Sequence, residues 1–423
     1  MRQRSVILGR EGSLFLLFSI VLLFQLSMVK YTLNLGGVGT IANFLMLLGL
    51  SSMAVRNIAN RAFVPNVWFF YLIPGILVYA GYLLNISRSV VANISAAGSL
   101  GFLIPWAAYL VVPFFIRSLS DSETIWRFFY RTMLVVCVIG VAEYVLIFEG
   151  VLPPRIIETP LGTFLSGELT VFHMLEDQSP YHRFYAIFPE PGTFAMCLLP
   201  VILYALVYKK YIGLTLFTVS LFLTDSLGGM IGLIMLLSLY IFGRLKQSKF
   251  SIGISVVVVC IFAVGIASYF SSYLIEVYSS KGQSAEVREN NVANVVGKLP
   301  QLVINHPIGF LLNGEAMSSI DSDDYFGSNF ALGNALIIGG LMSLLGYCMM
   351  LVSCLVIPSL SLARRIADID HLVVFPSLLV ALIFIFQRGT VMDSAIFAFL
   401  FSPSIIRNFG NPPIFHRPQG NPP

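Results

Sequence analysis

Residues 182–208 read HRFYAIFPEPGTFAMCLLPVILYALVY, and this stretch passes from a charged segment directly into an apolar run of membrane-spanning length. Arg183 and Glu190 stand at the border, and a proline flanks the carboxylate on each side. Proline begins helices readily but is disfavoured in their interior. The stretch therefore predicts a helix over 189–208 that starts at a membrane surface. Charge at that depth is costly and is usually retained for function.

The composition extends the same pattern to the whole chain of 423 residues. Hydrophobic side chains make up 57% of the chain and charged ones 11%, against about 25% charge in a soluble domain. The apolar segments are continuous runs, unlike the short alternating strands of an outer-membrane barrel. The expected fold class is therefore an all-α integral membrane protein.

Twelve apolar runs are the candidate membrane spans, since a helix needs roughly 20 apolar residues to cross a bilayer. One polytopic membrane domain then covers 1–410, and the Pro-rich segment 411–423 is predicted to be a disordered tail. The first run has no small-residue cleavage site, which favours a span over a cleavable signal. We expect spans at about 12–29, 37–54, 66–85, 97–116, 131–149, 189–208, 211–224, 227–243, 252–271, 329–357, 372–387 and 391–406.

The distribution of Lys and Arg predicts the orientation of these spans, because both residues favour cytoplasmic loops. With the N-terminus in the cytoplasm, 17 of the 25 Lys and Arg residues lie on the inner side and 8 on the outer side. This bias predicts that both termini are cytoplasmic. Two predicted outer loops, about 150–188 and 272–328, exceed the usual connection length, which indicates that the outer face carries the function.

The first candidate site is at the start of the span over 189–208. A helix that begins near Glu190 points free backbone N–H groups and the positive end of its dipole at the outer surface. Together with Arg183 it predicts a binding site for phosphate. Glu190 is either a base or a residue that caps the helix and pairs with Arg183.

The second long outer loop supplies a further cation. Residues 285–304 carry valine and leucine at helical spacing, which predicts an amphipathic helix lying at the membrane interface. Arg288 either faces a membrane cavity from this helix or pairs with a neighbouring glutamate on a solvated face. His306 follows in a His-Pro-Ile-Gly turn, where it is either a structural turn residue or a binding residue.

The last spans hold two more candidates. Asn329 starts a Gly-rich helix and is either its N-cap or a sugar ligand, and the glycines are predicted to allow close helix packing. Arg388 lies between two close spans and either binds a diphosphate or pairs with Asp393. The acidic segment 321–324 has the residue type for a divalent cation but no evident companion ligands. We therefore expect neither a metal nor a cofactor.

Four segments of the chain stand out in order: Arg183 with FPEPGTFA at 188–195, LTDSLGG at 223–229, Arg288 with HPIG at 306–309, and Ser328-Asn329 with Gly339-Gly340. Together they resemble motifs of the Wzy-type polysaccharide polymerase and O-antigen ligase superfamily. The resemblance departs from the family at two positions. Leu227 stands where the family has arginine, and Ser328 stands where the ligase branch has a functional histidine. The second departure favours polymerase over ligase.

This resemblance implies a GT-C-like polymerase and ligase architecture, with short helices in the long periplasmic loop, in the bacterial inner membrane. The implied substrate is an oligosaccharide on undecaprenyl diphosphate, and the implied reaction transfers the growing glycan to a new lipid-linked repeat unit at the periplasmic face. A Wzz-like chain-length regulator and a flippase are the suggested partners besides membrane lipids, and no nucleic acid is expected.

The resemblance and the outer-face charges together give the expected site residues. A departing diphosphate needs cations in a low-dielectric site, and arginine suits its geometry. Aromatic residues near 181–188 stack on sugar rings or belong to an interfacial aromatic belt; Tyr185 and Phe188 are two of them. The expected catalytic residues are Arg183, Glu190 and Arg288; the expected substrate-binding residues are Arg388, Tyr181, His182, His306 and Asn329.

Two other functions stay open. An O-antigen ligase would transfer the glycan to lipid A core, and a flippase would move lipid-linked oligosaccharides without forming a bond. A flippase needs a charged pathway through the membrane, whereas the predicted spans hold few ionisable residues near their centres, namely Glu143, Asp225 and Asp393. The chain has no P-loop motif, which disfavours an ATP-driven pump.

Overall fold

The computed structural model describes most of the apolar runs. The predicted span at 252–271, nearly all of the one at 12–29, and the tail at 411–423 lie outside the described residues. Those described are 28–33, 35–59, 65–92, 101–115, 119–159, 162–174, 183–247, 293, 296–310, 331–362, 368–382, 384 and 395–410.

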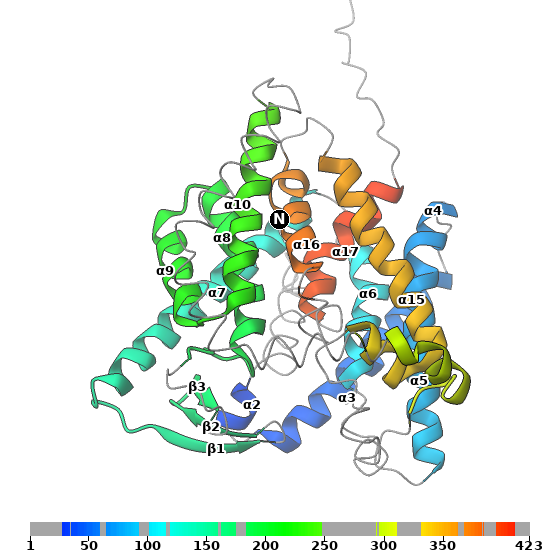
Figure 1. Ribbon diagram of the computed structural model, residues 1–423, viewed down its shortest axis with the longest axis horizontal. Helices are drawn as coiled ribbons and strands as arrows, with labels where there is room; N and C mark the ends of the chain where they lie inside the picture. The colour runs from blue at the N-terminus through cyan, green and yellow to red at the C-terminus, as the bar shows by residue number, and fades with distance from the viewer. Residues whose placement is uncertain are drawn as a thin grey trace, which may run out of the picture.

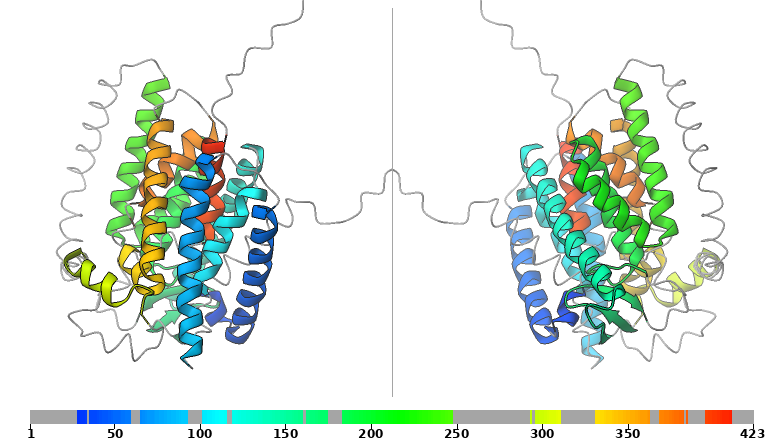
Figure 2. Two further views of the ribbon diagram at one scale, coloured as in Figure 1. Left: turned by 90° about the vertical axis from the view of Figure 1, so that its right-hand side faces the viewer. Right: turned by 90° about the vertical axis from the view of Figure 1, so that its left-hand side faces the viewer.

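The described chain is an array of apolar helices (Figure 1). Its long helices run roughly side by side along one direction (Figure 2), as membrane spans do. The elements are α2 (Val29–Thr32), α3 (Gly36–Ala59), α4 (Pro65–Val67), the π-helix η2 (Trp68–Leu72), α5 (Ile73–Val91), α6 (Leu103–Phe115), α7 (Leu119–Phe148), α8 (Pro191–Val207), α9 (Tyr211–Leu223), α10 (Leu227–Gln247), α15 (Ala331–Leu362), the π-helix η4 (Asp370–Val374), α16 (Phe375–Ala381) and α17 (Ala395–Gly410).

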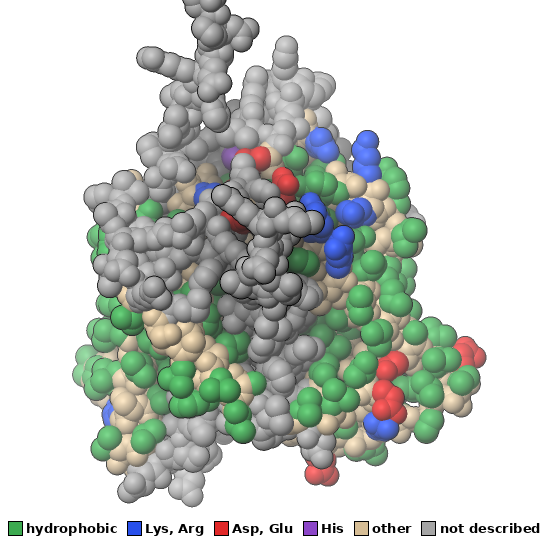
Figure 3. Space-filling view, turned by 180° about the vertical axis from the view of Figure 1, so that it is seen from behind, with side chains coloured by type: hydrophobic (Ala, Val, Ile, Leu, Met, Phe, Trp, Pro, Cys, Tyr) green, Lys and Arg blue, Asp and Glu red, His purple; other side chains and the backbone are tan. Residues whose placement is uncertain are grey.

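Four helical segments are long and apolar enough to cross a membrane, and shorter apolar helices pack among them. Many outward side chains are apolar and exposed; Ile212 is 87% exposed and Leu45 62%. Figure 3 shows hydrophobic side chains between two ends at which the described charges gather. The chain is therefore a helical membrane protein. The four long segments are Trp68–Val91, Asp121–Phe148, Leu227–Arg244 and Ala331–Ser359.

Each long helix overlaps a predicted span. The helices α3, α10, α15 and α17 end four or five residues beyond the predicted ends, and two further differences are larger. The helix predicted at 131–149 begins at Leu119 instead. Its first turns carry charged residues such as Asp121, so the helix extends beyond the apolar run from which the span was predicted. The helix predicted at 66–85 continues to Val91. That extension carries two polar residues described below.

The first long loop holds a small antiparallel sheet that the sequence patterns did not predict. Its strands β1 (Arg155–Thr159), β2 (Gly162–Ser166) and β3 (Val171–Met174) pair in the order β1-β2-β3. We call the end of the helix array that carries this sheet the sheet end; it is at the bottom of Figure 1. In the second long loop, residues 296–305 are helical, as predicted for the end of 285–304.

The helices α5 and α15 pack closely against each other. A Cβ added to Gly346 would lie 2.5 Å from the carbonyl oxygen of Pro74, and one added to Gly81 would lie 2.5 Å from that of Gly339. The hydroxyl of Ser343 donates to the carbonyl oxygen of Val78 at 3.1 Å. The predicted packing role is confirmed for Gly339 and Gly346, since small residues bring the two backbones together.

Candidate functional site

The segment 183–190 crosses the sheet end and is held by backbone hydrogen bonds on two sides. The amide of Val171 in β3 donates to the carbonyl oxygen of Ala186 at 2.6 Å, and the amide of Phe184 donates to that of Leu223 at 3.0 Å. Ala186 has φ 50°, which is uncommon for a residue with a side chain. The surrounding contacts therefore hold this segment in one path between the sheet and the end of α9.

Aromatic rings fix the same segment against α7 and α8. Phe184 and Phe188 are fully buried, and the ring centroids of Phe188 and Phe194 stack at 5.3 Å. A Cβ on Gly140 of α7 would lie 2.7 Å from the ring of Phe184. Tyr185 is only 3% exposed. The suggestion that Phe188 and Tyr185 stack on sugars is therefore wrong, because both rings are occupied in protein packing.

Arg183 brings the first two motif segments together. Its guanidinium Nη2 donates to the carbonyl oxygen of Asp225 at 3.4 Å. Asp225 has φ 48° and lies in the turn between α9 and α10. The structure thus places this aspartate in a turn, not at the centre of a span. The contact sets the positive charge of Arg183 beside the start of α10 and just ahead of α8.

Glu190 occupies the N-cap position of α8 with an extended backbone, φ −144° and ψ 142°. Its carbonyl oxygen accepts a hydrogen bond from the amide of Phe194 at 3.1 Å, but its side chain makes no capping hydrogen bond. The suggestion that the carboxylate caps the helix is therefore wrong. Glu190 and Arg183 lie at the two ends of the segment 183–190, and Glu190 adjoins a helix N-terminus that attracts negative charge.

A second cluster forms where the loop 306–310 meets a kink in α15. Ile337 and Leu341 are four residues apart and would bond to each other in a regular helix. Here the amide of Leu341 donates to the carbonyl oxygen of Pro307 at 2.9 Å, and that of Phe310 donates to Ile337 at 2.9 Å. The loop thus replaces one hydrogen bond of the helix with two of its own. This brings the HPIG turn of the third motif segment against Gly340 of the fourth.

Glycine is required at both faces of this contact. Gly340 has φ 65° and ψ −158°, and its Cβ would lie 2.5 Å from the carbonyl carbon of Ile308. Gly309 has φ 94°, and its Cβ would lie 2.6 Å from the carbonyl oxygen of Ile337. Only glycine combines this backbone conformation with the space available. The glycines of these two motifs therefore have a structural explanation.

Two residues of α5 that the sequence analysis missed complete this second cluster. Asn85 is fully buried, and its Nδ2 donates to the carbonyl oxygens of Phe310 and Ile338, each at 2.7 Å. Arg88 donates from Nη2 to the carbonyl oxygen of Gly309 at 2.7 Å. The available signal was a polar pair three residues apart at the end of an apolar run, which places both on one helix face.

His306 lies beside this pair. Its ring stacks on Phe310 with centroids 3.9 Å apart, and its carbonyl oxygen accepts a hydrogen bond from the amide of Gly309 at 2.9 Å. Burial lowers the pKa of His306, and the positive charge of Arg88 lowers it further. The imidazole is therefore neutral at pH 7, and its main-chain contacts support the turn role.

The other candidate residues lie outside the described residues. They are Tyr181, His182, Arg288, Asn329 and Arg388. The acidic segment 321–324 and Asp393 also lie outside. Within the described part of the chain, no group of three His, Cys, Asp or Glu side chains is placed to hold a metal ion.

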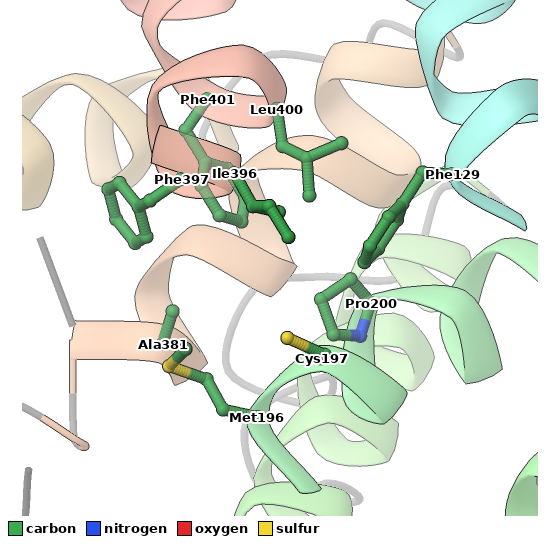
Figure 4. Close-up of a pocket in the computed structure, with 9 residues that line it drawn as sticks. All are labelled: Phe129, Met196, Cys197, Pro200, Ala381, Ile396, Phe397, Leu400 and Phe401. Carbon is green, nitrogen blue, oxygen red and sulfur yellow. The ribbon is translucent and has the colours of Figure 1, made fainter. Parts of the chain in front are cut away.

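A small cavity of about 20 Å³ lies between α7, α8, α16 and α17 (Figure 4). Its walls are apolar side chains together with the sulfur atoms of Met196 and Cys197. A lining of this kind offers no partner for a sugar hydroxyl or a phosphate. This cavity is therefore not a candidate site for a sugar or a phosphate.

Comparison with known proteins adds no assignment. No protein-family model matches the sequence, and no curated protein matches it either. The function is therefore argued from the motif residues and from their contacts in the fold.

Proposed function

We propose that this chain is a Wzy-type polysaccharide polymerase. It transfers a growing glycan from undecaprenyl diphosphate to a new lipid-linked repeat unit at the periplasmic face of the bacterial inner membrane. The observation that carries this proposal is the contact of Arg183 with the carbonyl oxygen of Asp225 at 3.4 Å. It joins two of the four motif segments beside the N-terminus of α8.

The chemistry fits this arrangement. The acceptor hydroxyl attacks the anomeric carbon of the donor, and the bond from that carbon to the diphosphate oxygen breaks with its electron pair. Arg183 and the N-terminal N–H groups of α8 stabilise the departing negative charge. Glu190 takes the proton of the acceptor hydroxyl as general base.

The remaining site residues stay predictions on the same basis. Arg288 and Arg388 contribute further positive charge to the diphosphate site, while Tyr181, His182 and Asn329 contact the sugars. The donor carries its own activated bond, so the reaction needs no nucleotide. No metal or cofactor takes part in the proposal.

The described residues favour this enzyme over a flippase. Both Glu143 carboxylate oxygens accept backbone amides of the sheet region, and Oε2 also accepts the Thr170 hydroxyl at 2.5 Å. Asp225 lies in a turn. Neither carboxylate therefore supplies a charged step through the membrane. Ser328, which stands where the ligase branch has histidine, favours polymerase over ligase.

The test is to incubate the purified protein in detergent with its lipid-linked repeat unit and to separate the products on a gel. A ladder of longer glycans without ATP supports the polymerase. Intact substrate with no ladder, followed by transfer to a lipid A core acceptor, would replace it with the ligase. Polymer at the wild-type level from alanine variants of Arg183, Arg288 and Arg388 would refute the assignment.

A further inference from the structure

Arg88 is a half-buried cation that the motif resemblance does not include. Its Nη2 donates to the carbonyl oxygen of Gly309 at 2.7 Å. Its Nε is buried and has no hydrogen-bond partner within the part of the chain that the structure describes. Over the same residues no carboxylate forms a salt bridge with it. A guanidinium carries donors on one planar edge that match two oxygens of a phosphate.

Asn85 shows the same property one helical turn earlier on α5. The residue is fully buried, and both donor contacts of its Nδ2 are satisfied at 2.7 Å. Its Oδ1 is buried without a partner among the described residues. Leaving a buried polar atom unpaired is costly. An unpaired donor and an unpaired acceptor on one helix face indicate a ligand that offers both groups.

The loop lies directly against this pair. A Cβ on Gly309 would lie 3.1 Å from Asn85 Nδ2, which is tighter than ordinary van der Waals contact, so the close approach of the loop to Asn85 depends on glycine. His306 borders the pair from the loop side and is partly exposed. A neutral imidazole adds one donor without adding a second charge.

We propose that Arg88, with Asn85 and His306, forms a subsite for the phosphate group of a lipid. Arg88 donates from its guanidinium to the phosphate oxygens, and Asn85 Oδ1 accepts from a hydroxyl carried on the same ligand. The ligand is a phosphate-bearing lipid, either the polyprenyl diphosphate substrate or a bulk phospholipid. Its identity as substrate rests on the proposed function, whereas the phosphate site itself does not.

The experiment measures binding of undecaprenyl diphosphate and of phosphatidylglycerol to the full-length protein in detergent. Arg88→Gln is expected to weaken binding of at least one lipid about tenfold, as the loss of a charge-assisted hydrogen bond does. The matched control is Arg155→Gln, which removes the same charge at the same end of the molecule. Arg155 is 53% exposed and already pairs with Glu168, so binding should stay within about twofold.

The two lipids separate the sources of the phosphate. Weaker binding of undecaprenyl diphosphate alone assigns the subsite to the substrate, and equal weakening of phosphatidylglycerol assigns it to bulk lipid. Unchanged affinity for both lipids in a folded Arg88→Gln protein overturns the subsite. If that variant does not fold, Arg88→Lys keeps the charge but lacks the paired donors of the guanidinium. It should bind the lipid more weakly, and wild-type affinity for both lipids overturns the paired contact of Arg88 with the phosphate.

The polymer assay keeps this inference distinct from the proposed function. If the wild-type chain forms polymer and Arg88→Gln does not change lipid affinity, the subsite is refuted and the polymerase stands. If Arg88→Gln weakens lipid binding but the wild-type chain forms no polymer with any acceptor, the polymerase is refuted and the subsite stands.

Discussion

Arg407 forms an ion pair with Asp370, with Nη2 at 2.7 Å from Oδ1 and 2.9 Å from Oδ2. The pair joins α17 to the π-helical turn η4 at the end of the array opposite the sheet. The side chain of Asp370 is 4% exposed and that of Arg407 is 13% exposed, and the hydroxyl of Ser404 also donates to Asp370 at 2.7 Å. Breaking a buried pair leaves one charge without compensation.

Arg407→Met should therefore destabilise the protein by about 3–5 kcal/mol, measured as thermal unfolding in detergent. Glu168→Gln removes a partner of an exposed pair at the sheet end, where both side chains are more than half exposed, and should cost at most about 1 kcal/mol. Equal effects of the two substitutions would contradict the assignment of Asp370 and Arg407 as a buried pair.

Gly340→Ala tests the contact between the loop 306–310 and α15. The new Cβ would meet the backbone of Ile308 at 2.5 Å in a left-handed backbone conformation, so both the loop and the kink must shift. We expect a loss of about 2 kcal/mol or more and a loss of polymer formation.

The matched substitution is Gly243→Ala in α10, where an added Cβ meets nothing within 4 Å. Replacing a helical glycine by alanine stabilises by up to about 1 kcal/mol, so this variant should match or exceed the wild type in stability. A stable, active Gly340→Ala protein would show that the kink does not need glycine.

Arg183→Gln should reduce polymer formation by about 10²–10³-fold while the protein stays folded. Arg183→Lys should restore only part of the rate, because a lysine ammonium lacks the paired donors of the guanidinium. The rate of glycan extension under saturating substrate is the measurement. A near wild-type rate for Arg183→Gln, alongside an unaltered thermal midpoint, would remove Arg183 from the site.

The pKa of His306 is lowered by burial and by Arg88, so the unfolded chain binds a proton at higher pH than the folded one. Stability from this group is fully present above the ordinary value of about 6.5 and is lost as pH falls below it. The thermal midpoint of the wild type should therefore drop more between pH 7.5 and pH 5.5 than that of His306→Gln. Parallel curves for the two proteins would contradict this assignment.

The positions of the helices could be predicted from local sequence because the length of an apolar run sets them. The helix predicted over 189–208 begins at Pro191 in α8 and ends at Val207. The start of α7 could not be predicted in this way, since charged side chains form helix as readily as apolar ones. The strands between 155 and 174 were also missed. They are short, and their polar and apolar residues do not alternate regularly enough to distinguish them from a loop.

Sequence order placed the motif segments, but only the fold shows which of them meet. Arg183 and Asp225 are 42 residues apart, and Asn85 and Ile338 are 253 apart; contacts at such separations depend on how whole helices pack. The sequence by itself determined the membrane class, most helix boundaries and the need for glycine-rich packing, since these follow from hydrophobicity and side-chain size. Only the tertiary structure decided that the carboxylate of Glu190 does not cap α8, that Phe188 is buried, and that Asn85 and Arg88 hold the kink of α15. The contacts of Asn85 and Arg88 depend on partners that folding brings from a distant part of the chain.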